Sequence, residues 1–179
     1  MSTIKTNQIQ TVAGKPIVNS TGSILQVVST TFTSTFSWTT KGSWVDMTGI
    51  SATITPSSSS NKVLVKVMLS TGDGGNNYER TYRVARGGTA IVEGASIANI
   101  MVRSSFATGM GAYASNASLA NTNYIYLDSP ASTSALTYQL QGWASTSSVT
   151  TSYINQPYAP AAASSSTGIS TMLLMEISG

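Results

Sequence analysis

Short runs of β-branched and aromatic residues recur from residue 23 to residue 179, and clusters of Gly, Ser, Thr and Asn separate them. Successive side chains of a strand point to opposite faces, and residues 62–70 show this alternation most clearly. Val63, Val65, Val67 and Leu69 fall on one face of that segment. Many short strands divided by turn signals are typical of a sandwich or barrel. The sequence therefore predicts an all-β fold, which we interpret as an antiparallel β-sandwich.

The same alternation predicts nine or ten strands and no helix. The Ala-containing stretch at residues 159–163 is too short to hold a helix in water. Gly87 and Gly88 predict a hairpin turn, because both residues accept a positive φ. One strand is expected between Ile97 and Ala114 without defined ends. The other strands are expected at residues 24–30, 44–55, 62–70, 78–85, 89–93, 123–128, 136–144, 150–155 and 170–178.

Residues 1–22 differ from the head domain expected at residues 23–179. They are polar, and Gly14 and Pro16 interrupt them. Isolated aliphatic side chains cannot form a core of their own, so we interpret the segment as an extended arm for attachment or trimerisation. The side chains expected to make its contacts are Ile4, Ile9, Val12 and Ile17. No segment approaches the roughly 20 apolar residues that span a bilayer, so membrane insertion is not expected.

Charged residues are scarce in this chain of 179 residues. They make up 8% of it, against roughly 25% in typical soluble domains. The chain has no Cys and no His, which excludes disulfides, zinc sites built on these residues and nucleophiles activated by histidine. The net charge of +3 comes from basic residues scattered along the sequence rather than gathered in a stripe. Nucleic-acid binding is therefore not expected.

No residues form a recognisable catalytic or metal-binding motif. Glycoside cleavage needs two carboxylates that flank the bond, and no two acids form a short motif among Asp46, Asp73, Glu79, Glu93, Asp128 and Glu176. The Gly- and Asn-rich residues 72–77 contain one carboxylate, which is too little charge for a good calcium site. We therefore expect no enzyme activity, no metal and no cofactor.

The last predicted strand is apolar on both faces. Its apolar residues are Met172, Leu173, Leu174, Met175 and Ile177. One face of a sandwich strand usually meets water, so such a strand indicates a central position with an outer face against another subunit. The scarcity of charge agrees, because interfaces are depleted of Lys, Glu and Asp. The alternative is that loops of the same chain cover this strand.

Three tyrosines lie in or near Gly-, Asn- and Ser-rich loops and are candidates for exposed contacts with a receptor: Tyr113, Tyr153 and Tyr158. An aromatic ring offers a flat apolar face that suits a sugar, with a polar group at its edge. The alternative is that these rings pack within the protein, since scattered surface aromatics are ordinary.

Five segments of the sequence carry a resemblance to a known class of protein: residues 2–11, 14–27, 54–65, 82–91 and 126–130. These segments resemble small fibre-type virion proteins of tailed bacteriophages, especially those that infect cyanobacteria and other marine bacteria. The resemblance implies a homotrimeric jelly-roll head, like the heads of complement and tumour-necrosis-factor proteins, joined to the virion by a short N-terminal segment. In such trimers the inner sheets meet around the three-fold axis.

These observations predict a non-enzymatic virion protein that serves as a tail fibre or fibre tip. It would attach to other virion proteins through its arm and contact a host surface polysaccharide through its loops. One alternative is a capsid decoration or head-fibre protein of the same fold. A second alternative, from another class, is a polysaccharide depolymerase.

Overall fold

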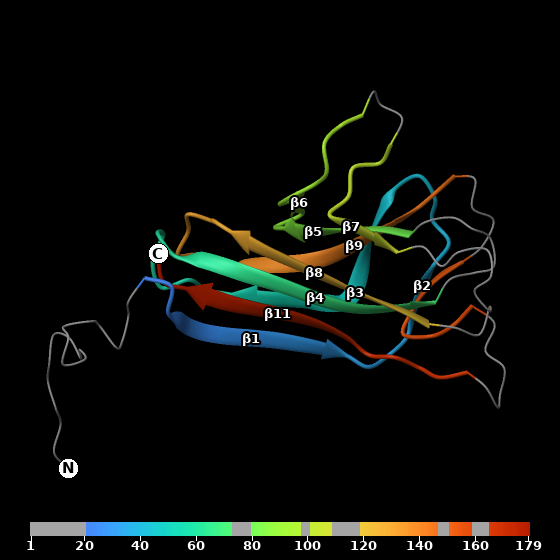
Figure 1. Ribbon diagram of the computed structural model, residues 1–179, viewed down its shortest axis with the longest axis horizontal. Helices are drawn as coiled ribbons and strands as arrows, with labels where there is room; N and C mark the ends of the chain where they lie inside the picture. The colour runs from blue at the N-terminus through green and yellow to red at the C-terminus, as the bar shows by residue number, and fades with distance from the viewer. Residues whose placement is uncertain (1–20, 73–79, 98–100, 109–118, 147–150, 159–164) are drawn as a thin grey trace, which may run out of the picture.

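The computed structural model describes residues 21–72, 80–97, 101–108, 119–146, 151–158 and 165–179. Within these residues the chain forms strands β1 to β11 and no helix. The strands make two antiparallel sheets that pack face to face (Figure 1). The predicted all-β antiparallel sandwich is therefore confirmed. The predicted arm at residues 1–22 lies almost wholly outside the described residues.

The six-stranded sheet has β4 at its centre. Its members are β1 (Ile24–Phe32), β2 (Phe36–Trp38), β4 (Lys62–Gly72), β8 (Leu119–Asp128), β10 (Ser152–Ile154) and β11 (Ser170–Ile177). β8 pairs along one edge of β4. β11 and then β10 pair along the other edge, and β1 and β2 follow outside them. The strand predicted to be central, β11, does lie between β1 and β4.

The five-stranded sheet has the order β3-β9-β5-β6, and β7 also pairs with β5. Its strands are β3 (Trp44–Ile54), β5 (Arg80–Arg86), β6 (Thr89–Ala90), β7 (Phe106–Thr108) and β9 (Leu136–Ala144). Between β6 and β7 the chain leaves the sheet and projects from the sandwich (Figure 1). The predicted strand at residues 89–93 therefore stops at Ala90.

The core lies between the sheets and consists of the alternating residues that the sequence indicates. Val63, Val65, Val67 and Leu69 of β4 are all buried. They pack against the inner residues of β3, Ile50, Ala52 and Ile54, which are also buried. The predicted assignment of faces is thus confirmed for β4.

The predicted turn at Gly87 and Gly88 is also confirmed. Their φ values are +56° and +84°. Ala85 pairs with Ala90 and Arg86 with Thr89 across it. Two successive residues with positive φ match the twist of a tight hairpin, which explains why glycine occupies both positions.

Candidate functional site

The outer side chains of four strands in the six-stranded sheet form adjacent rows. Val27 of β1, Met175 of β11, Leu64 of β4 and Leu127 of β8 are cross-strand partners in one row. The next row brings Leu173 and Ile125 to either side of Lys66. We call this surface the apolar face. Its apolar members are Ile24, Val27, Leu64, Met68, Ile125, Leu127, Leu173, Met175 and Ile177.

Much of the apolar face is open to solvent. Six of the eight exposed large apolar side chains of the described residues lie on it or, for Ile169, directly before β11. Ile125 is 59% exposed and Val27 is 54% exposed. The charged side chains on this surface are those of Lys62 and Lys66, and no acidic side chain within the described residues points towards it. Soluble monomers rarely expose contiguous apolar patches of this kind, so the apolar face is the candidate interaction site.

The predicted interface residues of β11 divide between the two faces. Leu173, Met175 and Ile177 point outward and are half-buried. Met172 and Leu174 are 0% exposed and belong to the core, so the expectation that they meet another subunit is corrected. The cause is the two-residue period of a strand, which sends neighbours to opposite faces.

The chain itself covers the far end of the same sheet surface. A Cβ atom on Gly72 would lie 1.9 Å from the backbone oxygen of Gln156. A Cβ atom on Gly168 would lie 2.2 Å from Oγ of Ser70. The chain therefore covers the outer side of β4 at this end, and the rows from Ile24 to Met68 remain open.

The predicted receptor-facing tyrosines are not gathered in one exposed loop. Tyr153 lies in β10, and its ring meets that of Tyr158 edge to face at 5.9 Å between centroids. Both side chains are half-buried. Tyr113 lies outside the described residues. Packing between two aromatic rings accounts for the first two without a ligand.

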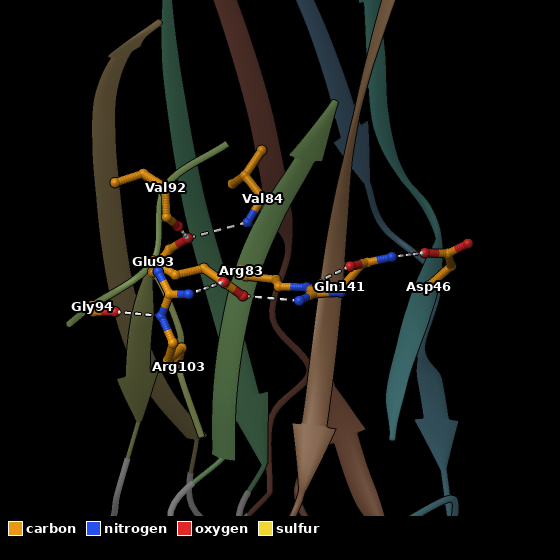
Figure 2. Close-up of polar contacts among 9 residues, drawn as sticks. Asp46, Arg83, Val84, Val92, Glu93, Gly94, Arg103 and Gln141 are labelled. Carbon is orange, nitrogen blue, oxygen red and sulfur yellow. Dashed lines mark hydrogen bonds and ion pairs between the residues drawn. The ribbon is translucent and has the colours of Figure 1, made fainter. Parts of the chain in front are cut away.

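The outer face of the five-stranded sheet carries a chain of polar contacts instead (Figure 2). Nε of Arg83 donates to Oε1 of Gln141 at 2.7 Å, and Nε2 of Gln141 donates to Oδ1 of Asp46 at 2.7 Å. On its other side, the Arg83 guanidinium pairs with the Glu93 carboxylate at 2.8 Å. It also lies 4.2 Å from the ring centroid of Trp44. Arg83 is thus held from three directions.

The projecting segment between β6 and β7 is fastened at its base. The Glu93 carboxylate also lies 3.8 Å from Arg103, whose Nε donates to the Gly94 carbonyl at 2.8 Å (Figure 2). Ser105 donates from its hydroxyl to the Val92 carbonyl at 2.6 Å and from its amide to Tyr82 at 2.9 Å. These contacts fix both limbs of the segment to β5.

Two of the four acids within the described residues are buried and engaged with other side chains. Asp128 accepts hydrogen bonds from Arg86 and from the Tyr138 hydroxyl, the latter at 2.7 Å. Burial, together with Asp128, raises the pKa of Tyr138. Glu176 is 1% exposed and accepts hydrogen bonds from neutral groups. Neither carboxylate faces solvent as an acid–base pair with another acid would require. Asp73 and Glu79 lie outside the described residues.

A metal-binding group of three or more acids, His or Cys does not occur among the described residues. The same residues contain no helix that is long and apolar enough to cross a membrane. Residues 72–77, where no calcium site is expected, lie outside the described part of the chain apart from Gly72.

The apolar face extends beyond β11, and this extension was not predicted from the sequence. A signal was present in β8, where Tyr124, Ile125, Tyr126 and Leu127 make both faces apolar, as in β11. The positions of Val27 and Met68 on this face could not be predicted from the sequence, because the residues beside them are set by the register between strands.

Comparison with known proteins identifies no family for this chain. No protein-family model matches it, and a search of curated proteins found no match.

Proposed function

We propose that this chain is a non-enzymatic structural protein of a bacteriophage virion, a tail fibre or fibre tip that works as a homotrimer. The observation that carries the proposal is the apolar face, which extends across β1, β11, β4 and β8. Burial of such a surface against other copies removes apolar area from water at about 25 cal/mol per Å². The phrases shared with small phage fibre proteins give the virion context.

A three-fold arrangement suits this face better than a two-fold one. In a two-fold dimer the apolar face meets the same face of the other copy, so Lys62 and Lys66 of both copies would be brought into one interface. In a ring of three, the face of one copy meets a different surface of the next copy. The lysine stems can then lie along apolar neighbours while their ammonium groups reach solvent at the rim.

We also propose that the sandwich is a jelly roll of the complement and tumour-necrosis-factor type. The support is that consecutive long strands alternate between sheets: β3, β5 and β9 in one, and β4, β8 and β11 in the other. Each sheet then contains strands that are distant in sequence, as two successive Greek keys require.

The test is the solution mass of the full chain by light scattering. We expect three times 18.6 kDa. Ile125→Asp places a carboxylate opposite Lys66 on the apolar face, where assembly would have to remove it from water, so it should give the monomer mass with unchanged circular dichroism. The matched control is Thr53→Asp, an exposed position on the outer face of the other sheet, which should remain trimeric. A monomeric wild-type chain would refute the trimer.

The solution mass of a shortened chain, residues 23–179, distinguishes two roles for the arm at residues 1–22. A trimer without residues 1–22 would make the arm an attachment device that joins the head to other virion proteins. A trimer only with these residues would make the arm the oligomerisation element. The second result would contradict the assignment of the apolar face as the assembly surface.

A capsid decoration or head-fibre protein is the alternative within the same fold. It requires the same trimer and the same anchor, so the test is location rather than mass. Antibodies against residues 23–179 should label the tail of intact virions if the proposal holds. Label spread over the shell would favour the alternative.

A polysaccharide depolymerase is the alternative from another class. Asp46 and Glu93 are the described acids on the outer face of the five-stranded sheet, where a substrate could reach them. Purified protein incubated with host polysaccharide should release no short sugars if the protein is structural. Release of oligosaccharides that is lost in Asp46→Asn would favour the enzyme.

A further inference from the structure

Six outward side chains of the five-stranded sheet form two adjacent rows of three. The register of β3, β9 and β5 puts Trp44, Trp143 and Thr81 in one row. It puts Asp46, Gln141 and Arg83 in the next. We call these six residues the grid. Strands lie about 5 Å apart and alternate residues about 7 Å apart, so the grid covers roughly 7 by 10 Å, the size of one or two sugar rings.

The polar row is held in place before any ligand arrives. Gln141 joins Arg83 to Asp46 through two hydrogen bonds of 2.7 Å (Figure 2). Asp46 is exposed and uses one oxygen, Oδ1, in this chain of contacts. Its other carboxylate oxygen therefore faces solvent in a fixed position, where it can accept hydrogen bonds from neighbouring hydroxyl groups.

The aromatic row lies directly beside these polar groups. One face of the Trp44 ring carries the Arg83 guanidinium at 4.2 Å. Trp143 is half-buried and makes no contact with another aromatic ring in the described part of the chain. Beside it, the hydroxyl of Thr81 is buried and makes no hydrogen bond within the described residues. A partly exposed indole next to fixed hydroxyl-binding groups is a combination that suits a sugar ring.

A purely structural role explains only half of this arrangement. The contacts of Arg83 with Glu93, and of Glu93 with Arg103, fasten the projecting segment to β5. Asp46 and Trp143 lie on the opposite side of Arg83 and take no part in that fastening. Both side chains lie on the outer surface of the five-stranded sheet. Assembly through the apolar face of the other sheet would leave this surface pointing outward.

We infer that the grid binds a sugar residue of a surface polysaccharide. The indole of Trp143 stacks on the C–H side of the sugar ring. Asp46 accepts hydrogen bonds from two neighbouring hydroxyls of the sugar, and Arg83 donates to a substituent of the sugar ring. This inference rests on the proposed function in one respect only, namely that the apolar face is covered and the opposite sheet is outward. Sugar binding itself requires the grid and not the trimer.

The test is an NMR titration of the full chain with a panel of neutral, amino and acidic mono- and disaccharides at millimolar concentrations. Trp143→Phe identifies the indole N–H signal of Trp143. We expect at least one sugar to shift that signal saturably. Asp46→Asn should weaken the affinity about tenfold, as the loss of a charged hydrogen-bond acceptor predicts. The matched control is Thr137→Ala, an exposed change elsewhere on the same sheet face, which should bind as wild type.

Three outcomes would overturn the inference. No sugar moves the Trp143 signal; Asp46→Asn binds as tightly as the control; or the shifts gather at residues outside the grid. Ile125→Asp separates this inference from the proposed function. If that variant is monomeric and still binds the sugar, the grid acts independently of assembly. If the wild-type chain is monomeric and binds the sugar, the trimer is wrong and the grid stands.

Discussion

At Glu176 neutral hydrogen-bond donors stabilise a buried carboxylate. Gln26 donates to it at 2.6 Å, the Ser57 amide at 2.6 Å and the Asn61 side chain at 2.5 Å. Burial alone would raise the pKa of Glu176, but the hydrogen bonds from Gln26, Asn61 and Ser57 outweigh it and lower the pKa to about 2. The carboxylate thereby joins β1, the β3–β4 loop and β11.

This contact predicts a specific dependence of stability on pH. The folded pKa of about 2 lies below the ordinary value of 4.5, so the stabilisation is present above pH 4.5 and is lost as the pH falls towards 2. Its size is on the order of 3 kcal/mol. Glu176→Gln should be less stable at pH 7 and should lose this dependence, as measured by denaturant unfolding at pH 7, 4 and 2.5. Gln26→Leu should move the acid transition upward. An unchanged pH slope in Glu176→Gln would contradict the assignment.

Among the strands, the bounds of those with a long apolar alternation could be predicted closely, and the bounds of the short ones could not. β9 has the predicted bounds, Leu136–Ala144. β3, β4 and β11 differ from their predictions by one or two residues at their C-terminal ends. β2, with three residues, was not predicted. A strand of three residues has no period to detect, and it exists because β10 offers its edge.

A prediction at the level of a single strand concerns the C-terminal end of β4. Gly72→Ala would place a methyl group 1.9 Å from the Gln156 oxygen, which belongs to backbone and cannot swing aside. We expect a loss of about 2–4 kcal/mol in the free energy of unfolding, with disruption of the β4–β10 pairing. Gly94→Ala is the control, because its nearest atom would lie at 3.7 Å. Urea unfolding measures the stability of both variants. Equal stability would show that residues 155–158 do not pack closely against β4.

At the scale of the whole molecule, the candidate site could be predicted only in part. The doubly apolar β11 was visible in the sequence, and three of its five predicted residues face outward. The remaining rows arise when β1, β4 and β8 take their registers beside it. The grid is beyond sequence reasoning for the same reason. Trp44, Trp143 and Thr81 are distant in the chain and become neighbours only through pairing.

Assembly through an apolar face predicts an unusual response to salt. Attraction between charged surfaces weakens as salt screens it, whereas copies with a net charge of +3 and lysines near the contact repel each other. We therefore expect the trimer to tighten modestly between 50 and 500 mM NaCl and to weaken on cooling. Sedimentation equilibrium at two salt concentrations and two temperatures measures both effects. Dissociation at high salt would mean that ion pairs hold the trimer.

The two ends of the head meet at one pole of the sandwich. The amide of Gly22 donates to the Ser178 carbonyl at 2.8 Å, and that of Ser178 to the Ser23 carbonyl at 2.9 Å. β1 runs from this pole towards the other and β11 runs back towards it, with Ile24 beside Ile177 and Phe32 beside Ser170. Antiparallel hydrogen bonds lie across the strands. A head tethered at residue 22 and pulled at its far pole would therefore bear tension along the strands, with the bonds of the β1–β11 pair loaded together in shear. Pulling Gly22 away from Ser178 would instead peel that pair open one bond at a time.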